Sequence, residues 1–487
     1  TFATPPTMTF PFTADHDSYG FTLLFDDKAN WYPKSVTIAA YNSSNALISS
    51  TTVTATSARL VIEMPVTNYR KIVLTFHSTQ SPYQKVHLSE VIFGVVEYHD
   101  KSSVPSATIL YEIDPRMKTF PAGEMVQTID NSDGRYNMRS PNSLYAYLQT
   151  GQAFDTNEIG LGGIADALEY INMGKQFYFA KAQSNEATMT AVLTSYDLVY
   201  QMDKTTYRKG VQGTDTVSNL IDAVLTDSGR SIAANIPSGV GARVIGSNIP
   251  IVSHREAIRM ICEAAHCVGF INRDNEQQLV DIVAGTSVDA LDGDNMEEWP
   301  DINVDDAINT VDVSVYSYYE SSFDKATIYS GTADVDGTED VWIEYDAASS
   351  ASATVTDGTL NSTTYYMRAA KLNITGSGTV TIAVTGYALS ASKTAYSANN
   401  ITGDETVQSY SVDNELVNST VNAASIAAYQ LGLSRITYPF IDMGNPAREM
   451  ADTITVGDAY GGTGSAVVTK QKFTYDGGLK CEVEAIG

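Results

Sequence analysis

The strongest structural constraint in this sequence is a predicted β-hairpin near its C-terminal end. Two runs that alternate apolar and polar residues, 465–475 and 479–486, are separated only by Asp476, Gly477 and Gly478. Alternation with a period of two is typical of strands with one buried face. An Asp-Gly-Gly turn between such runs favours a tight hairpin, because its central residues need positive φ values. We therefore expect two paired strands here, and a further strand at 452–458.

A helix is predicted ahead of this hairpin, over residues 418–435, with Asn418 as its N-cap. Apolar residues recur at helical spacing, so we expect one inward face. That face would carry Val421, Ala424, Ala428 and Leu431. The Gly-Asn-Pro sequence at 444–446 then favours a turn, because proline has no backbone donor and restricts the residue before it.

The composition favours a mainly β, multidomain chain that does not grip nucleic acid. A chain of 487 residues is long enough for about three or four domains. Its 29 Tyr, against 15 Phe and 3 Trp, favour β-structure with half-exposed faces. The 57 acidic and 30 basic residues give a net charge of −27. Such a balance argues against sequence-specific nucleic-acid binding, which needs clustered Lys and Arg, but it would suit a wall past which DNA moves.

The cysteines and the apolar segments indicate intracellular folding and no membrane span. Cys262, Cys267 and Cys481 form no disulfide framework, and the first two point in different directions from one predicted helix. Such a set suits a protein that folds inside a cell. No stretch approaches the roughly 20 apolar residues of a transmembrane helix, and no signal sequence opens the chain.

Residues 1–103 are predicted to form a β-sandwich. Short strand-like runs at 21–25, 35–41, 59–64, 71–76 and 86–96 are separated by turn residues. The segment 31–48, "WYPKSVTIAAYNSSNALI", is similar to discoidin-type (galactose-binding-like) jelly rolls, whose loops can bind sugars. The candidate carbohydrate contacts are Trp31, Tyr32 and Tyr83. In the alternative these three rings only cap the sandwich, because no basic or amide cluster accompanies them.

Two domains are predicted between residues 104 and 300. Residues 104–208 are β-rich, with strands expected at 111–115, 125–129, 144–148, 176–181 and 188–194. Residues 209–300 are mixed α/β. There an apolar stripe (Val217, Leu220, Ile221, Val224 and Leu225) predicts a helix that stops at Gly229. A capping box opening at Ser253 predicts a second helix that ends at Gly269, with Ile258, Ile261, Cys262 and Ala265 facing inward. A hairpin of 270–272 with 279–282 follows.

The last predicted domain, residues 301–487, opens with an alternating strand at 311–318. A Ser/Thr/Ala/Gly-rich β-segment at about 325–400 is interpreted as an insert within this domain. The hairpin at its end completes the domain.

No cofactor or metal site is predicted. Cys262, His266 and Cys267 share a helix, but a structural zinc needs four ligands and no second cluster lies nearby; buried core residues are the simpler interpretation. The acidic run 301–306, with Asp312, has the alternating oxygens of a calcium loop. It lacks the glycine and the bidentate glutamate that such a loop needs, so a solvated acidic linker is favoured.

No catalytic site is predicted either. The carboxylate pairs Glu112 with Asp114 and Glu297 with Glu298 are of the type used in glycoside hydrolysis, but such pairs arise by chance in so acidic a chain. The "GLGG" run at 160–163 lacks the lysine that follows a phosphate-binding loop, so a flexible loop is expected there. None of the six histidines lies in a known catalytic motif.

Four stretches, in the same order, resemble the hub proteins of phage tail tips and baseplates. They are residues 69–94, 169–207, 253–274 and the final segment, which contains "GNPAREMADTITVGD" at 444–458 and "VVTKQKFTYDGGLKCEVEAIG" at 467–487. The resemblance implies two β-barrel tube domains, at 104–208 and 301–487, with the α/β domain (209–300) between them. It also implies that the jelly roll projects outward and that further strands precede Thr1.

The resemblance implies a structural, non-enzymatic protein of the virion tail tip or baseplate, assembled in the bacterial host cytoplasm. Three copies would form a ring that joins a sixfold tail tube to a threefold tip and lets DNA pass. The implied partners are two further copies, the tail tube protein, distal tail or baseplate proteins, and a tape measure or spike protein. Asp312, Glu320 and Asp324 are candidates for acids that line the lumen and repel a passing polyanion.

Two other classes of function stay open. The first is a carbohydrate-binding adhesion protein that acts through the jelly roll on a cell-surface glycan. The second is a cell-wall-degrading tail lysin, an activity that the resemblance would place in a C-terminal extension.

Overall fold

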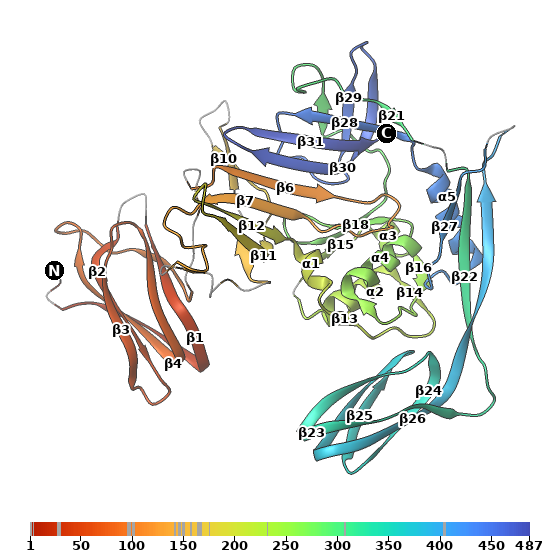
Figure 1. Cartoon of the computed structure of the whole chain (residues 1–487), viewed down its shortest axis with the longest axis horizontal. Helices are drawn as coiled ribbons and strands as arrows, with labels where there is room; N and C mark the ends of the chain where they lie inside the picture. Colours follow the sequence, from red (N-terminus) through yellow and green to blue (C-terminus); the bar gives the residue numbers. More distant parts are fainter. Residues whose placement is uncertain are drawn as a thin grey trace. The chain divides into compact units, whose positions relative to one another are not determined.

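The computed structural model describes most of the chain, and it divides into two compact units, Thr1–Ser103 and Val104–Gly487. The described residues are 2, 4–26, 31–94, 99, 103–140, 143–144, 148, 151–155, 158–162, 168–174, 176–230, 232–305, 308–402 and 406–487. The fold is mainly β and multidomain, as predicted (Figure 1). The division falls at the first of the predicted domain boundaries; the others stay predictions.

The first unit is one antiparallel sheet, with five strands among its described residues in the order β3-β2-β4-β1-β5. The strands are β1 (Thr7–Phe25), β2 (Pro33–Tyr41), β3 (Leu47–Thr54), β4 (Arg59–Thr79) and β5 (Leu88–Ile92). The pairing of the two long strands, β1 and β4, shifts register between Pro11 and Gly20. Such irregularities bend strands, which lets the sheet enclose a core that includes Phe21, Leu23, Ile38, Ile62 and Leu74.

The jelly-roll interpretation of this unit stays a prediction. A jelly roll has about eight strands in two sheets, whereas the described residues pair as one sheet. Residues 95 and 96, at the end of the predicted strand 86–96, lie outside the described residues.

The second unit contains a large sheet, in the order β21-β28-β31-β30-β6-β7-β12-β11-β8 over the described residues, with β20 and β29 attached beside this path. Its earlier strands are β6 (Ser106–Glu112), β7 (Glu124–Asp130), β8 (Ala153–Asp155), β11 (Gln176–Asn185), β12 (Thr190–Tyr196), β20 (Asp289–Leu291) and β21 (Asn303–Val304). Its later strands are β28 (Ile436–Asp442), β29 (Thr453–Gly457), β30 (Thr463–Tyr475) and β31 (Leu479–Ile486). A separate pair is formed by β9 (Glu158–Gly162) and β10 (Leu168–Asn172).

The predicted C-terminal hairpin is confirmed as β30 and β31, and Gly477 in its turn has a φ of +104°. β30 also pairs with β6, for example Phe473 with Ile109 and Gln471 with Tyr111. This pairing joins strands from the predicted first and second tube domains into one sheet (Figure 1).

The α/β part of this unit packs beside the sheet (Figure 1). Its helices are α1 (Leu198–Met202), α2 (Val217–Asp227), α3 (Ser238–Gly241) and α4 (His254–Ala264). Its short strands are β13 (Thr206–Tyr207), β14 (Thr214–Thr216), β15 (Ala234–Asn235), β16 (Val244–Gly246), β17 (Val252–Ser253), β18 (Val268–Ile271) and β19 (Gln277–Val280). The predicted stripe of α2 is buried, and Gly229 follows its C-cap with a φ of +70°.

Helix α4 begins as predicted, because the Ser253 hydroxyl accepts a hydrogen bond from the Glu256 backbone N–H. The prediction that it runs to Gly269 is wrong. Arg243 donates to the carbonyl oxygen of Ala265 at 2.7 Å, and His266 takes a positive φ of 47°. An arginine on the last carbonyls and a left-handed residue are both helix-ending features.

The final helix differs from its prediction in both its cap and its buried face. Helix α5 spans Thr420–Gly432 with Ser419, not Asn418, as N-cap. Val421 is 76% exposed. The buried residues are Asn422, Ala423, Ile426, Ala427 and Gln430. The apolar pattern misses this face because two of its members are amides, and Gln430 is buried while it accepts a hydrogen bond from Arg116 at 2.8 Å.

The predicted insert is a β-structure with its own small core, centred on Ile343, Leu372, Ile374 and Ile382. Its strands and the two that flank it are β22 (Thr310–Glu320), β23 (Ala326–Glu344), β24 (Ala348–Thr356), β25 (Thr359–Tyr365), β26 (Ala369–Asn399) and β27 (Ser409–Val412). β26 is long enough to pair with β22 at one end and with β23, β24 and β25 at the other (Figure 1).

Two predicted segments between residues 144 and 163 include residues that the structure does not describe. Of the expected strand 144–148, residues 145–147 lie outside the described residues. The flexible loop expected at 160–163 is wrong for residues 160–162, which belong to β9 and pair with β10, while residue 163 is not described. None of the helices in the described chain has the length and apolarity to cross a membrane.

Candidate functional site

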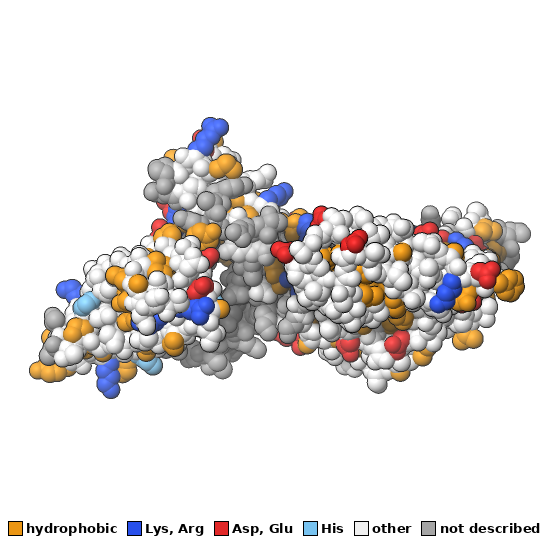
Figure 2. Space-filling model, turned by 90° about the horizontal axis from the view of Figure 1, so that it is seen from below, with side chains coloured by type: hydrophobic (Ala, Val, Ile, Leu, Met, Phe, Trp, Pro, Cys, Tyr) orange, Lys and Arg blue, Asp and Glu red, His pale blue; other side chains and the backbone are white. Residues whose placement is uncertain are grey.

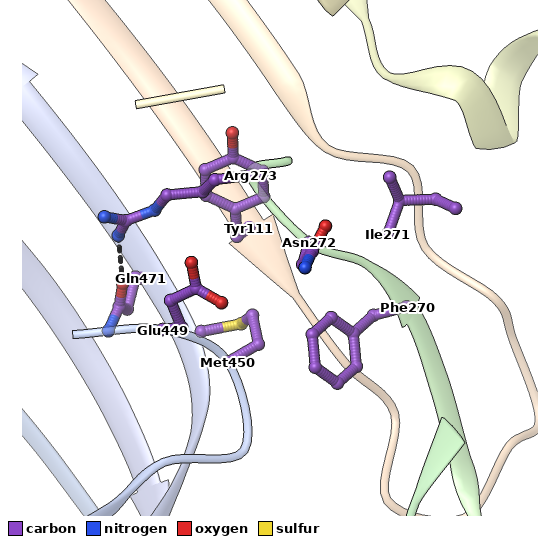
Figure 3. A pocket seen from close by; sticks show the side chains of 8 residues that line it. All are labelled: Tyr111, Phe270, Ile271, Asn272, Arg273, Glu449, Met450 and Gln471. Atoms are coloured by element: carbon purple, nitrogen blue, oxygen red, sulfur yellow. Dashed lines mark hydrogen bonds between the residues drawn. The ribbon is translucent and has the colours of Figure 1, made fainter. Parts of the chain in front are cut away.

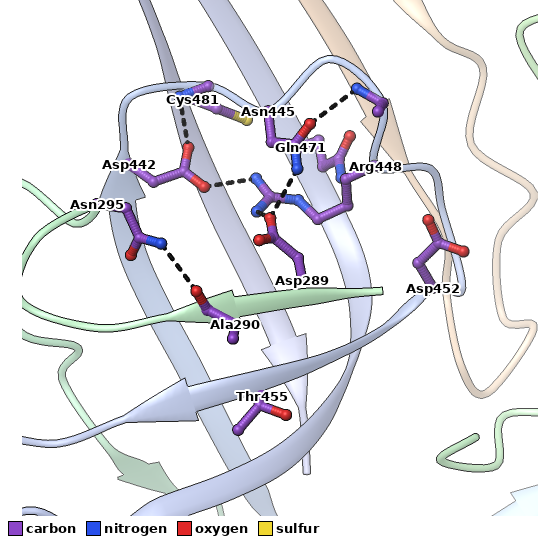
Figure 4. A network of polar contacts seen from close by, with 12 residues as sticks. Asp289, Ala290, Asn295, Asp442, Asn445, Arg448, Asp452, Thr455, Gln471 and Cys481 are labelled. Carbon is purple, nitrogen blue, oxygen red and sulfur yellow. Dashed lines mark hydrogen bonds and ion pairs between the residues drawn. The ribbon is translucent and has the colours of Figure 1, made fainter. Parts of the chain in front are cut away.

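Among the described residues of the second unit, two of the most deeply buried charged side chains are those of Asp442, the last residue of β28, and Arg448, in the loop that leads to β29. The Arg448 side chain is completely buried and forms ion pairs with Asp442 at 2.8 Å and Asp289 at 3.2 Å (Figure 4). The backbone N–H of Gly444 donates to Asp442 at 2.8 Å, and the Asn445 amide donates to Asp289 at 3.0 Å. The predicted turn at 444–446 is thus held by carboxylates that Arg448 neutralises.

A second buried guanidinium, that of Arg273, reaches this loop from the turn between β18 and β19. It donates to the carbonyl oxygen of Pro446 and, at 2.6 Å, to that of Arg448. Burial lowers the pKa of Arg273. The Gln471 amide oxygen accepts from Arg273 at 3.3 Å (Figure 3), and the opposite orientation of that amide would instead give it two partners on Arg448. The α/β part is therefore connected to the sheet through arginine.

A small pocket opens beside these arginines. It is lined by Tyr111, Phe270, Ile271, Asn272, Arg273, Glu449, Met450 and Gln471 (Figure 3). Burial raises the pKa of Glu449, while the nearby Arg273 lowers it. The Tyr111 hydroxyl donates to the carbonyl oxygen of Met173 at 2.6 Å, so it is already engaged. Paired charges and engaged hydroxyls are typical of a structural junction between elements rather than of a reaction centre.

The predicted carbohydrate contacts differ in their surroundings. Trp31 is 37% exposed, forms a backbone bridge with Asp26 and lies near Lys85 and His87. Tyr32 packs against the core of the first unit, and its hydroxyl donates to Thr56 at 3.4 Å. Tyr83 is fully exposed, with a positive φ of 65°. Their role in sugar binding stays a prediction.

The predicted lumen acids lie in or just after β22. Asp312 accepts a hydrogen bond from Ser397 on β26, and Glu320 accepts one from Ser349 at 2.7 Å. Glu320 and Asp324 are exposed, and Asp312 is half-buried. These three residues share one region of the chain, and their placement toward a lumen stays a prediction.

The cysteines of α4 and its C-terminal turn are core residues. Cys262 and Cys267 are buried free thiols. The His266 Nδ1 lies 3.1 Å from the Arg243 guanidinium, and burial together with that charge lowers the His266 pKa. A neighbouring cation disfavours a metal at this ring. In the described residues no three His, Cys, Asp or Glu side chains gather as metal ligands would.

The other carboxylates singled out from the sequence are spread over turns and edges. Asp114 accepts hydrogen bonds from the N–H groups of Arg116 and Thr119, while Glu112 is exposed. Glu297 and Glu298 are both exposed. Asp301 lies just before β21 and Asn303 is its first residue, while Asp306 of the calcium-like run lies outside the described residues.

Sequence reasoning missed Arg273 and Arg448. Both lie in short loops, without the periodicity that marks helices and strands. The sequence signal that points to them is the small number of basic residues, 30 against 57 acidic ones. In so acidic a chain, an arginine next to a Gly-Asn-Pro turn is a candidate partner for buried carboxylates.

Comparison with known proteins gives distant structural likenesses only. No family model matches the sequence, and no curated protein matches it. Among solved structures, a tail protein from Neisseria meningitidis MC58 is similar over 83% of this chain and 94% of that chain, with a TM-score of 0.46 and 9% identity. The 43 kDa tail protein of prophage MuSo2 from Shewanella oneidensis is similar over 80% and 94%, with a TM-score of 0.43 and 11% identity. Prophage tail protein gp18 from Listeria monocytogenes EGD-e is similar over 82% and 91%, with a TM-score of 0.41 and 8% identity. Likeness at this distance does not establish a shared function.

Proposed function

We propose that this chain is a structural, non-enzymatic hub protein of a phage tail tip or baseplate. The proposal rests first on the four ordered stretches of sequence that resemble such hubs. The structural observation that carries it is the β6–β30 pairing, which joins β6, β7, β12, β11 and β8 to β28, β31 and β30 in one sheet. A continuous wall built from two β-rich segments of one chain suits a protein that must line a passage.

Ring closure is the second part of the proposal. The order of the large sheet ends at β21 and at β8 over the described residues. Open edges invite pairing with another chain, and head-to-tail contacts that close produce rings. Three copies with two tube-type segments each would supply the elements needed to meet a sixfold tail tube. Asp312, Glu320 and Asp324 would contribute acid to the lumen, so that passing DNA is repelled rather than held.

The proposed partners follow from that place in the particle. They are two further copies of the chain, the tail tube protein, distal tail or baseplate proteins, and a tape measure or spike protein. The protein would assemble in the bacterial host cytoplasm and then reside in the virion tail tip or baseplate.

A second candidate function is adhesion to a cell-surface glycan through the first unit. The observation that favours it is the full exposure of the Tyr83 ring, which leaves the ring open to contact a sugar.

The direct test measures the mass of the assembly and images it along its axis. Native mass spectrometry of the purified full chain should give a trimer, and electron microscopy along its axis should show a closed ring with a lumen poor in Lys and Arg. A stable monomer at concentrations used for assembly, or a ring of another size, would contradict the hub.

The non-enzymatic part has its own test. Incubation with peptidoglycan and with wall polysaccharide should release no soluble fragments. A turnover signal that disappears when one carboxylate, such as Glu112 or Glu297, is changed to the amide would instead support the tail lysin.

A further inference from the structure

The insert presents a polar face on the side of its sheet opposite to its core. Side chains alternate between the two faces of a strand, and Ile343, Leu372 and Ile374 are buried on the inner face. Their neighbours on β23 and β26 therefore point outward. In this outer face Asp340 is paired with Asn373 and Trp342 with Lys371.

The polar groups of this face are fixed by one another. Asp340 lies 2.7 Å from the Lys371 ammonium and accepts a hydrogen bond from the Asn373 amide at 2.8 Å. The Asn361 amide donates to the Asn373 carbonyl oxygen at 3.0 Å and to Thr375 at 2.8 Å. Each amide and carboxylate retains unused hydrogen-bonding capacity, and these side chains are exposed or half-buried. These polar side chains are therefore held in place before a ligand binds, and each still has hydrogen-bond donors or acceptors that are open to a ligand.

An aromatic pair lies at the end of this row. The Trp342 and Tyr366 rings stack with their centroids 5.8 Å apart and an interplanar angle of 18°. Neither ring belongs to a hydrophobic cluster in the described residues or packs against one. Both rings are half-buried. Aromatic rings usually contribute buried area to a core or an interface, and this pair keeps part of its surface open outside the core of the insert.

The surface chemistry of the insert limits what it would bind. None of the large exposed apolar side chains in the described chain lies within residues 326–399, so an apolar protein contact is not favoured. The same segment has seven acidic and three basic residues, which disfavours an anionic polymer. Figure 2 shows the face of the molecule that is seen from below in Figure 1, and on that face charged side chains are scattered among uncharged ones.

We propose that this face binds a neutral glycan. A sugar ring has an apolar C–H face, which fits an aromatic platform, and hydroxyl edges, which fit planar carboxylate and amide groups. Trp342 with Tyr366 supplies the platform, and Asp340, Asn361 and Asn373 supply donors and acceptors beside it. Ligand sites commonly combine an apolar surface with a few fixed polar groups in this way. The site is distinct from Trp31, Tyr32 and Tyr83, and it does not depend on the hub proposal.

The test uses the full chain with four neutral probes: cellotetraose, maltotetraose, chitotetraose and β-1,4-galactotetraose. Saturation-transfer NMR should detect at least one of them, with a Kd at or below about 1 mM by calorimetry. Trp342→Ala should weaken that binding at least about tenfold, and Trp342→Tyr should retain most of it. Asn361→Ala, at an exposed position outside the core, should also weaken binding.

The matched control is Trp299→Ala, at a tryptophan that is 46% exposed and belongs to none of the sites described above. It should bind the same probe as the wild type does. Circular dichroism and thermal melting should show that each variant is folded. If none of the four probes binds, if Trp342→Ala and Asn361→Ala both bind as the wild type does, or if Trp299→Ala weakens binding as much as Trp342→Ala does, the proposal is overturned.

Discussion

The loop that connects β28 to β29 depends on Arg448. Its side chain is fully buried between Asp289 and Asp442, and Asp442 is itself buried. A buried ion pair adds little net stability compared with a well-packed apolar pair, because both charges lose their hydration. Removing one partner is different, since it leaves an uncompensated charge inside the protein.

We therefore expect Arg448→Met to lower the free energy of unfolding of the second unit by about 3–5 kcal/mol. Denaturant titration followed by tyrosine fluorescence would measure this change. The matched control is Lys393→Met, which breaks the exposed pair with Asp413 at 2.7 Å and should cost at most about 1 kcal/mol. Equal losses in the two variants would show that burial does not set the strength of these contacts.

Asp197 gives the second unit a dependence on pH. Its carboxyl caps α1 by accepting from the Val199 N–H at 2.9 Å, and it also accepts from the Gly123 N–H at 2.8 Å. Burial raises its pKa to about 7 from an ordinary value of 3.8, although those N–H groups and Arg255 lower it. Because the folded pKa lies above the unfolded one, this group's contribution to stability is complete below the unfolded pKa. It is lost as the pH rises toward 7.

The melting temperature of the wild type minus that of Asp197→Asn should therefore fall between about pH 5.5 and about pH 7.5. Taking the difference between the two melting temperatures removes the contribution of the other carboxylates, because they are present in both proteins. Differential scanning calorimetry at several pH values would measure it. A difference that stays flat, or that rises with pH, would show that the carboxyl is already ionised in the folded protein.

At the residue scale, the sequence predicted core positions better than polar ones. The stripe of α2 and the Ser253 cap follow from local periodicity and local hydrogen bonding, which are visible in the sequence. Arg273 contacts the backbone of Pro446 and Arg448, and no local pattern records a contact over so long a separation. The same holds for the Trp342–Tyr366 stack, in which a ring on β23 meets a ring from the turn between β25 and β26.

Among the elements, the β30–β31 hairpin is the one whose turn chemistry was predicted most directly. Gly477 has a φ of +104°, and an added Cβ there would meet no atom within 4 Å. A substitution at this position therefore tests backbone strain without a steric clash. Gly478 has equally open space and is not among the residues with positive φ, which makes it a matched control.

Gly477→Ala should destabilise the second unit by about 1–3 kcal/mol, because a residue with a Cβ rarely adopts this conformation. Gly478→Ala should change stability by less than about 0.5 kcal/mol. Thermal melting of the two variants beside the wild type would measure both effects. A larger loss for Gly478→Ala would contradict the assignment of strain to Gly477.

Helix α5 shows why an element can be predicted while its orientation is not. The sequence pattern located the helix, but it placed Val421 inside, where the structure buries Asn422 and Gln430 instead. A face that includes buried amides has a weak apolar signal, and Gln430 is stabilised there by Arg116, far away in the sequence. Tertiary hydrogen bonds decided the rotation of this helix.

At the scale of the whole molecule, the large sheet is the feature that local reasoning cannot supply. Several of its strands were predicted, including β7, β12 and β30, but β8, β20, β21 and β28 were not. The strand predicted at 111–115 overlaps β6 only at Tyr111 and Glu112. The pairing of β6 with β30 joins residues more than 350 positions apart, and strand patterns do not specify their partners. The insert was predicted from its composition, but composition does not predict that one strand of 31 residues, β26, supports it.

The division after Ser103 leads to the last prediction. The core of the first unit is built only from residues of that unit, and the core clusters of the second unit contain none of them among the described residues. A unit with its own core can fold alone. A chain of residues 104–487 should therefore melt within about 3 °C of the matching transition in the full chain, since its own core clusters stay complete.

The same truncated chain should assemble with the same number of protomers as the full chain, measured by native mass spectrometry at equal concentration. The control is residues 1–103 alone, which should be folded by circular dichroism and monomeric. If the truncated chain aggregates or changes its protomer number while the control is folded, the first unit contributes to the assembly contacts. In that case ring closure through the edges of the large sheet would be insufficient, because those edges remain intact in residues 104–487.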